Sequence, residues 1–237
     1  MKIALCLSGQ PRCFEKGFEY HKKNLLDRYD VTVFCHVWNS PNIEKLFELY
    51  KPEASMIEDS LTNDLTKYTR VPPPQPNWKV KDPARAAWNL TYSLMKANDL
   101  KSDYEKYHNM KFDWVVRSRY DFALNAQIPF EELDNTKLYI PNCRMTTGRD
   151  FGNDQFAFSS SENMDKYSNT FNRIDEFYDD GVTMIGEEMM SANWKSENLV
   201  GDNLVYFNPN HPFPPGSHNG TWHSLIRDDF EIGRAHV

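Results

Sequence analysis

The sequence has few features of secreted, membrane-bound or redox-active proteins. It contains four cysteines, Cys6, Cys13, Cys35 and Cys143, and no two of them form a CxxC pair. Cys6 and Cys35 lie inside apolar runs, where a thiol behaves as a small hydrophobic side chain. No apolar run approaches the length of a membrane span, and no charged segment leads into the first apolar run. We therefore expect reduced cysteines and a cytoplasmic chain without a membrane-spanning segment.

Several motifs of nucleotide-dependent and metal-dependent enzymes are also missing. The sequence has no GxSxG, GxxxxGK[ST] or GxGxxG string, which excludes the simplest hydrolase, kinase and dehydrogenase interpretations. Histidines are scattered, at His36, His211, His218 and His223, without the spacing of a zinc site. The net charge of -7 opposes binding to nucleic acid, because that binding depends largely on Lys and Arg replacing counterions. We expect neither zinc nor a nucleic-acid partner.

What the sequence does contain is an alternation of short apolar runs with helical patterns. Strands are predicted at residues 3–7, 31–38, 54–57, 113–124, 137–140, 155–159 and 204–207, and helices at 13–29, 43–50, 84–110, 162–178 and 187–198. This order is typical of a layered, Rossmann-like α/β fold with a mostly parallel, mixed sheet. The chain length fits a single domain over residues 1–230. The last seven residues, EIGRAHV at 231–237, match the translation of a common sequencing adapter, so we expect them to lie outside the fold.

Polar residues follow the first two predicted strands. In such sheets the ligand lies beyond the carboxyl ends of the strands. The first strand is followed there by Ser8, Gly9, Gln10, Pro11 and Arg12. Gly9 permits close approach of the backbone to a ligand, and Arg12 offers two parallel donors to a phosphate. A solvated turn explains the same string equally well. His36 and Trp38 end the second strand and either contact the ligand or pack on the core.

A second cluster closes the predicted central strand, whose core is Trp114-Val115-Val116. If the chain stays extended, alternation places Arg117, Arg119 and Asp121 on one face. Charges at the end of a sheet are costly unless they pair or bind a ligand. A functional site is therefore favoured here, and a structural ion pair is the alternative.

Carboxylates form the third cluster. Gly152-Asn153-Asp154-Gln155 precedes the strand at 155–159, and Glu187 and Glu188 open the last predicted helix. Glutamates in a first helical turn often only complement the helix dipole. Asp154 is therefore the first candidate for a catalytic carboxylate, and Glu187 and Glu188 follow it.

Five segments together resemble glycosyltransferases of bacterial surface polysaccharides, bacteriophages and large algal viruses. They are KIALCLSGQPR, VTVFCHVW, WNLTYSLMKANDLKSDYE, DWVVRSRYDFAL and NDQFAFSSSENM. The resemblance runs over about residues 2–167. The resemblance implies a GT-A-type fold, with a nucleotide-binding half at about residues 1–125 and an acceptor half at about 126–230. It also implies a hexosyltransferase-like reaction of polysaccharide biosynthesis, with a UDP- or GDP-linked sugar as donor and a glycan or other hydroxyl compound as acceptor.

In that family an Asp-x-Asp motif at the end of the central strand binds a divalent cation and the diphosphate. Arg119-Tyr120-Asp121 occupies this place, so that Asp121 is left as the candidate ligand of Mn or Mg. A guanidinium group, from Arg119, Arg117 or Arg12, can itself neutralise a diphosphate. By the same resemblance residues 8–12 hold the nucleotide. Asp154, Glu187 or Glu188 then lies on the acceptor side, where an inverting enzyme needs a base.

Two other functions remain open at this point. The altered Asp-x-Asp motif suits a catalytically inactive module that only binds a nucleotide or a sugar. A nucleotidyltransferase on a similar sheet is the second alternative.

Overall fold

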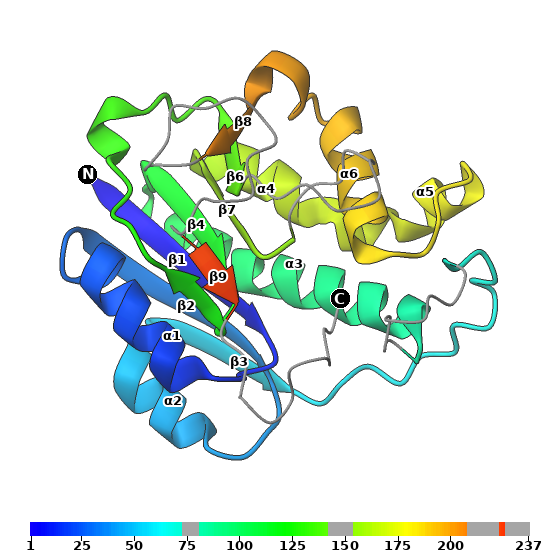
Figure 1. The fold of residues 1–237 in the computed structure, drawn as a ribbon, viewed down its shortest axis with the longest axis horizontal. Coiled ribbons are helices and arrows are strands. Elements are labelled where there is room, and N and C mark those ends of the chain that lie inside the picture. The colour runs from blue at the N-terminus through cyan, green and yellow to red at the C-terminus, as the bar shows by residue number, and fades with distance from the viewer. Residues whose placement is uncertain (73–80, 142–153, 208–222, 226–237) are drawn as a thin grey trace.

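A seven-stranded mixed sheet forms the centre of the computed structural model, which describes residues 1–72, 81–141 and 154–207 and the backbone of 223–225. The strands are β1 (Lys2–Gly9), β2 (Asp30–Trp38), β3 (Ala54–Glu58), β4 (Trp114–Ser118), β6 (Leu138–Pro141), β7 (Phe156–Ser159) and β8 (Leu204–Phe207). Their order in the sheet is β3-β2-β1-β4-β7-β6-β8 (Figure 1). β7 runs antiparallel to both of its neighbours, and the remaining neighbours pair in parallel. The predicted α/β fold with a mostly parallel sheet is confirmed.

Helices cover both faces of this sheet. α1 (Phe14–His21) and α2 (Ile43–Tyr50) pack on one face, and α3 (Pro83–His108), α4 (Ser161–Ser168) and α6 (Gly186–Ser196) pack on the other (Figure 1). β1 is therefore buried on both sides. Leu5 and Leu7 belong to the core under α1 and α2, whereas Ala4 and Cys6 belong to the core under α3. A strand in this position needs a continuous apolar run, which is what residues 3–7 provide.

The order of the strands creates a crevice at one end of the sheet. After β1 the chain moves outward to β2 and β3, and α3 then carries it back across the sheet to β4 on the other side of β1. Ligands of open α/β sheets bind at such a reversal, outside the carboxyl ends of the two strands. α3 begins at the same end, where Asp82 caps it by accepting a hydrogen bond from the backbone N–H of Arg85 and Pro83 takes the first helical position.

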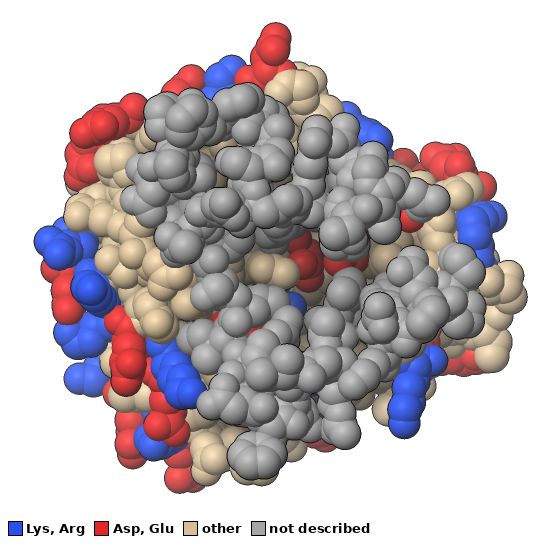
Figure 2. All heavy atoms as spheres, viewed as in Figure 1, with Lys and Arg blue, Asp and Glu red and all other residues tan. Residues whose placement is uncertain are grey.

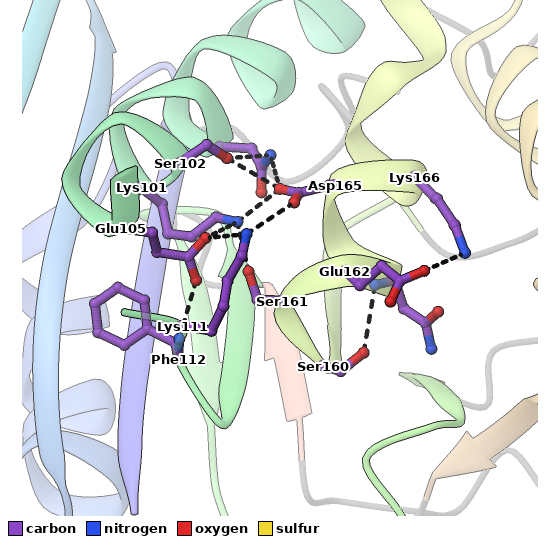
Figure 3. A network of polar contacts seen from close by, with 12 residues as sticks. Lys101, Ser102, Glu105, Lys111, Phe112, Ser160, Ser161, Glu162, Asp165 and Lys166 are labelled. Carbon is purple, nitrogen blue, oxygen red and sulfur yellow. Dashed lines mark hydrogen bonds and ion pairs between the residues drawn. The ribbon is translucent and has the colours of Figure 1, made fainter. Parts of the chain in front are cut away.

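At the opposite end of α3 a buried polar network joins this helix to α4 (Figure 3). The fully buried Lys101 ammonium donates to Ser161 Oγ at 2.8 Å, to Asp165 Oδ1 at 2.6 Å and to Glu105 Oε2 at 3.2 Å. Glu105 in turn accepts the backbone N–H of Phe112 at 2.9 Å, just before β4 begins. Each buried charge thus has a partner, and the network fixes the position of α4 against the sheet.

Three predicted elements are shorter or more broken than expected. The strand predicted at 113–124 ends at Ser118, turns over residues 119–121, where the N–H of Phe122 donates to the carbonyl of Arg119, and resumes as β5 (Phe122–Leu124). β5 pairs with β9 (His223–Leu225) in a separate two-stranded sheet. The helix predicted at 162–178 is α4, a 3-10 turn (Asn169–Arg173) and α5 (Ile174–Asp179), and the helix at 13–29 continues after α1 as a π-helical turn (Lys22–Leu26).

Further 3-10 turns lie at Phe130–Glu132 and Gly201–Asn203. Within the described ranges no helix is both long and apolar enough to cross a membrane. Several predictions concern residues outside the described ranges, namely Cys143, Gly152, Asn153, His211, His218 and the segment 231–237.

A close approach between α1 and the turn after β4 can be tested by mutation. A β-carbon on Gly17 would overlap the carbonyl oxygen of Tyr120. We expect Gly17→Ala to lower the free energy of unfolding by about 1–3 kcal/mol, because the turn must move to make room. Urea denaturation measures this change. Lys16→Ala, on the exposed side of the same helix, should stay within about 0.5 kcal/mol. If Gly17→Ala instead stabilises the protein, as helix propensity alone would favour, the two segments are not in contact.

Candidate functional site

A cavity of about 920 Å³ opens at the carboxyl ends of β1, β2 and β4. It brings together most of the predicted site residues: Ser8, Gly9, Gln10, Arg12, Trp38, Arg117, Arg119, Asp154 and Glu187. Its volume lies in the range of ordinary ligand pockets. In Figure 2 both acidic and basic side chains are visible at the bottom of a hollow in the middle of the face that is shown. The cavity therefore lies where the reversal of strand order places a ligand.

The loop after β1 forms one wall of the cavity. Gly9 has a φ of 107°, a conformation that residues with a side chain rarely adopt, although a β-carbon there would meet no atom within 4 Å. The backbone thus requires glycine at this position for its conformation and not for space. The N–H of Arg12 donates to the carbonyl of Gln10 at 2.8 Å, which tightens the turn before α1. Ser8 Oγ is buried and has no hydrogen-bond partner within the described part of the chain.

Arg117 lies at the end of β4 and is only 2% exposed. Its Nη1 group donates to the backbone carbonyl of Asp154, while Nε and Nη2 have no partner among the residues that the structure describes. Burial lowers the pKa of this guanidinium. Buried donors without partners are costly. The unused donors of Arg117 therefore mark a place where a ligand oxyanion would gain two hydrogen bonds.

Arg119 is held by Asp121 in the turn that follows β4. Nε and Nη2 of Arg119 donate to the two carboxylate oxygens of Asp121 at 2.8 and 2.9 Å. Burial would lower the pKa of Arg119, but the charge and the hydrogen bonds of Asp121 raise it, so the guanidinium stays charged. Arg119 lines the cavity, whereas Asp121 lies behind it and is 1% exposed. In this arrangement Asp121 orients an arginine.

The expectation of a metal at Asp121 has no support in this geometry. Both carboxylate oxygens of Asp121 accept hydrogen bonds from Arg119. Among the described residues no group of three or more His, Cys, Asp or Glu side chains is arranged to hold a metal ion. The dependence on Mn or Mg stays a prediction.

Two acidic side chains face these arginines from other elements. Asp154 precedes β7 and is 8% exposed, and Glu187 is the second residue of α6 and is 6% exposed. Burial, and then the charge of Asp154, raise the pKa of Glu187 to about 8. Glu187 Oε2 has no hydrogen-bond partner within the described ranges. Glu188, the third predicted carboxylate, is half-buried and is not part of the cavity wall.

His36 lies behind the wall of the cavity and not in it. The ring is fully buried, with Nδ1 at 2.7 Å from Ser93 Oγ and Nε2 at 2.9 Å from Glu58 Oε2, and burial lowers its pKa. Trp38, which does line the cavity, stacks on Tyr92 with ring centroids 5.9 Å apart and meets His36 edge-on. His36 packs against Trp38 and holds it in the cavity wall. The geometry does not favour direct contact between His36 and a ligand.

No model of a known protein family matches the chain, and no curated protein matches it. The resemblance to glycosyltransferases therefore remains a hypothesis, and its support has to come from the cavity.

The start of α3 contributes a wall of the cavity that was not among the predicted site residues. Lys81, Asp82, Arg85 and Asn89 line the cavity from the first turns of this helix or from just before it. The guanidinium of Arg85 donates to the carbonyls of Leu61 and Asn63 at 2.8 and 2.6 Å, so it also holds the segment after β3. Asp82-Pro83 is a sequence typical of a helix start, and helix N-termini attract anions. That signal would have placed the start of α3 at the site, because a crossover helix after β3 begins near the carboxyl ends of the strands.

The raised pKa of Glu187 makes the stability of the protein depend on pH. Its unfolded pKa is close to 4.5 and its folded pKa is about 8, so the folded state holds a proton that the unfolded state has lost. Stability should therefore fall as the pH rises from about 4.5 to 8, with the full penalty present above pH 8. Glu187→Gln removes this penalty. We expect its Tm to exceed that of the wild type by roughly 5 °C or more at pH 8.5, and by much less at pH 5.

Thermal unfolding followed by circular dichroism at several pH values measures this difference. Glu162→Gln is the matched control, because Glu162 is also the second residue of its helix but its side chain is 78% exposed. It should show no gain in Tm with rising pH. Parallel Tm curves for Glu187→Gln and the wild type would contradict the assignment of a bound proton to Glu187.

Proposed function

We propose that this chain is a glycosyltransferase that moves a sugar from a UDP- or GDP-linked donor to a hydroxyl group of a glycan or other acceptor. The observation that carries the proposal is the pair Arg117 and Arg119 in the wall of a large cavity at the reversal of strand order. Arg117 is buried at the end of β4, and Arg119 lies in the turn after it with a side chain that is 18% exposed. Such a pair suits a ligand with concentrated negative charge, and a nucleoside diphosphate is the leaving group that the resemblance implies.

The arginines address the charge that develops during transfer. When the bond between the sugar carbon and the phosphate oxygen breaks, its electron pair stays on the diphosphate. A preorganised cation at that point stabilises the transition state by several kcal/mol. Arg119 is preorganised by its two hydrogen bonds to Asp121, and Arg117 has two donors without described partners. The turn at residues 8–12 supplies further donors on the nucleotide side.

An inverting enzyme needs a base that takes the proton of the acceptor hydroxyl. Asp154 lines the cavity next to the arginines, and its carboxylate can take the proton that the acceptor oxygen loses as it bonds to the sugar carbon. The volume of the cavity is at the upper end for ligand pockets, which suits a site for a donor and an acceptor together. These features support a transferase more than a module that binds one small ligand.

The decisive experiment incubates the purified protein with a panel of UDP- and GDP-sugars and follows the release of the nucleoside diphosphate. We expect slow release without an acceptor, through hydrolysis, and faster release with a glycan acceptor. Formation or consumption of pyrophosphate would indicate a nucleotidyltransferase. Binding of the nucleotide sugar without any turnover would indicate an inactive module. The ion pair between Arg119 and Asp121 lends weight to this alternative.

Substitution of the ion pair tests the role of the arginine. We expect Arg119→Ala to lower turnover by about a hundredfold or more, because it removes a charge that acts in the transition state. Asp121→Asn should be similarly damaging, since it frees the guanidinium to move. Arg173→Ala is the matched control, because Arg173 makes a comparable two-point ion pair with Glu176 away from the cavity.

Turnover is measured by release of nucleoside diphosphate, and folding is checked by circular dichroism. Near-normal turnover in both folded variants would show that the chemistry occurs elsewhere. Recovery of Arg119→Ala by added Mn alone would show that a metal carries the charge and that the arginine is structural.

A further inference from the structure

Glu187, a candidate base by the family resemblance, has no role in the proposed function, where Asp154 is the base. It lies in the first turn of α6, lines the cavity and is 6% exposed. Its Oε2 atom has no hydrogen-bond partner within the described part of the chain. A buried carboxyl oxygen without a partner, on a residue that lines a cavity, calls for an explanation, and a bound ligand is one.

The charges around Glu187 decide which form of the carboxyl group fits the site. Arg117 and Arg119 come from the end of β4 and the turn after it, Asp121 from the same turn, and Asp154 from the segment before β7. An ionised Glu187 would give three negative charges against two positive ones, in a place that has to receive a diphosphate. With a proton on Glu187 the charges balance.

Other charged groups line the same cavity at its rim: Arg12 and Lys81 add positive charge that a diphosphate can meet. Asp82 and Arg85 from the start of α3 line the same cavity and have opposite charges. Glu188, from the same helix as Glu187, further favours the protonated form, while Arg119 opposes it. Burial of Glu187, followed by the charge of Asp154, outweighs that opposition and raises its pKa above neutrality.

We propose that Glu187 is a neutral carboxylic acid in the resting protein and donates a hydrogen bond from its unpartnered oxygen to a phosphate oxygen of the bound nucleoside diphosphate. The inference rests on the proposed function, because it assumes that a diphosphate binds beside Arg117 and Arg119. Glu187 then assists the departing group and is not the base. As the sugar carbon leaves the phosphate oxygen with the electron pair on that oxygen, the hydrogen bond shortens, while Asp154 accepts the proton of the acceptor hydroxyl. This assigns different roles to two neighbouring carboxyl groups in different environments.

Binding of UDP and of GDP to the full chain, measured by titration calorimetry between pH 7 and pH 9, tests the proposal. If only the protonated form of Glu187 accepts the diphosphate, the Kd of the wild type should rise about tenfold over this range, as its proton is lost in the free protein. Repeating the titration at pH 8.5 in buffers with different ionisation enthalpies should show uptake of a proton on binding.

Glu187→Gln keeps a donor of the same shape. Its Kd should match that of the wild type at pH 7 within a few-fold and should not rise in this way, and its turnover should stay within about tenfold of the wild type.

Glu162→Gln serves as the control and should keep the pH dependence of the wild type, because Glu162 lies in the first turn of α4, away from the cavity. A wild-type Kd that does not change with pH, or a Glu187→Gln variant with the wild-type slope, would overturn the inference while leaving the proposed function intact. A folded Glu187→Gln variant that binds UDP or GDP more tightly and loses turnover by more than a hundredfold would show that Glu187 is an ionised base. Failure of the wild type to bind either nucleotide at every pH would instead overturn the proposed function and this inference with it.

Discussion

The placement of two guanidinium groups, one buried at the end of β4 and one held in the turn after it, is the constraint on which the site and its surroundings depend. Arg117 is almost fully enclosed, and the carbonyl of Asp154 accepts a hydrogen bond from its Nη1 group. Arg119 requires a carboxylate, and the chain supplies Asp121 two residues later by leaving the strand at Ser118 and turning. That turn brings the Tyr120 carbonyl against α1, where only glycine leaves enough room. The geometry of the proposed phosphate site is thus built into the packing of the central strand.

The other walls of the cavity are rigid for similar reasons of packing. Gly186 opens α6 so close to α3 that an added β-carbon would lie 2.5 Å from the side chain of Leu90. This contact sets the distance between the helix that carries Glu187 and the helix that carries Arg85 and Asn89. On the remaining side Trp38 is fixed by Tyr92 and by His36. Sites on such rigid elements need little reorganisation when a ligand binds, which favours catalysis by preorganised charge.

Much of the fold followed from local patterns in the sequence. The doubly buried β1 shows as a continuous apolar run, α2 begins and ends at the predicted residues, and Asp82-Pro83 marks the start of α3. The interruptions of the strand predicted at 113–124 and of the helix predicted at 162–178 depend on interactions that a periodic pattern does not contain. A strand pattern continues through Arg119 and Asp121, yet the strand ends at Ser118 and the two side chains pair within the turn that follows. The pattern of residues 162–178 is helical throughout, but Asn169 and Thr170 weaken the helix and the chain changes direction there.

The site was predictable as a set of residues but not as a set of roles. Polar residues after buried strands marked the cavity correctly, because the carboxyl ends of parallel strands meet at one edge of a sheet. Burial then separated residues that look equivalent in sequence: His36 and Asp121 lie behind the wall, and Arg119 and Glu187 line the cavity. In the motif that the resemblance implies, two aspartates and a divalent cation present a net charge near zero to the diphosphate. Here Arg117 and Arg119 are balanced by the carboxylates of Asp121 and Asp154 when Glu187 keeps its proton, and Arg12 and Lys81 add positive charge to the cavity wall. In the proposed site the arginine that replaces the first aspartate supplies positive charge next to the diphosphate, and the burial of Glu187 keeps a further negative charge away from it.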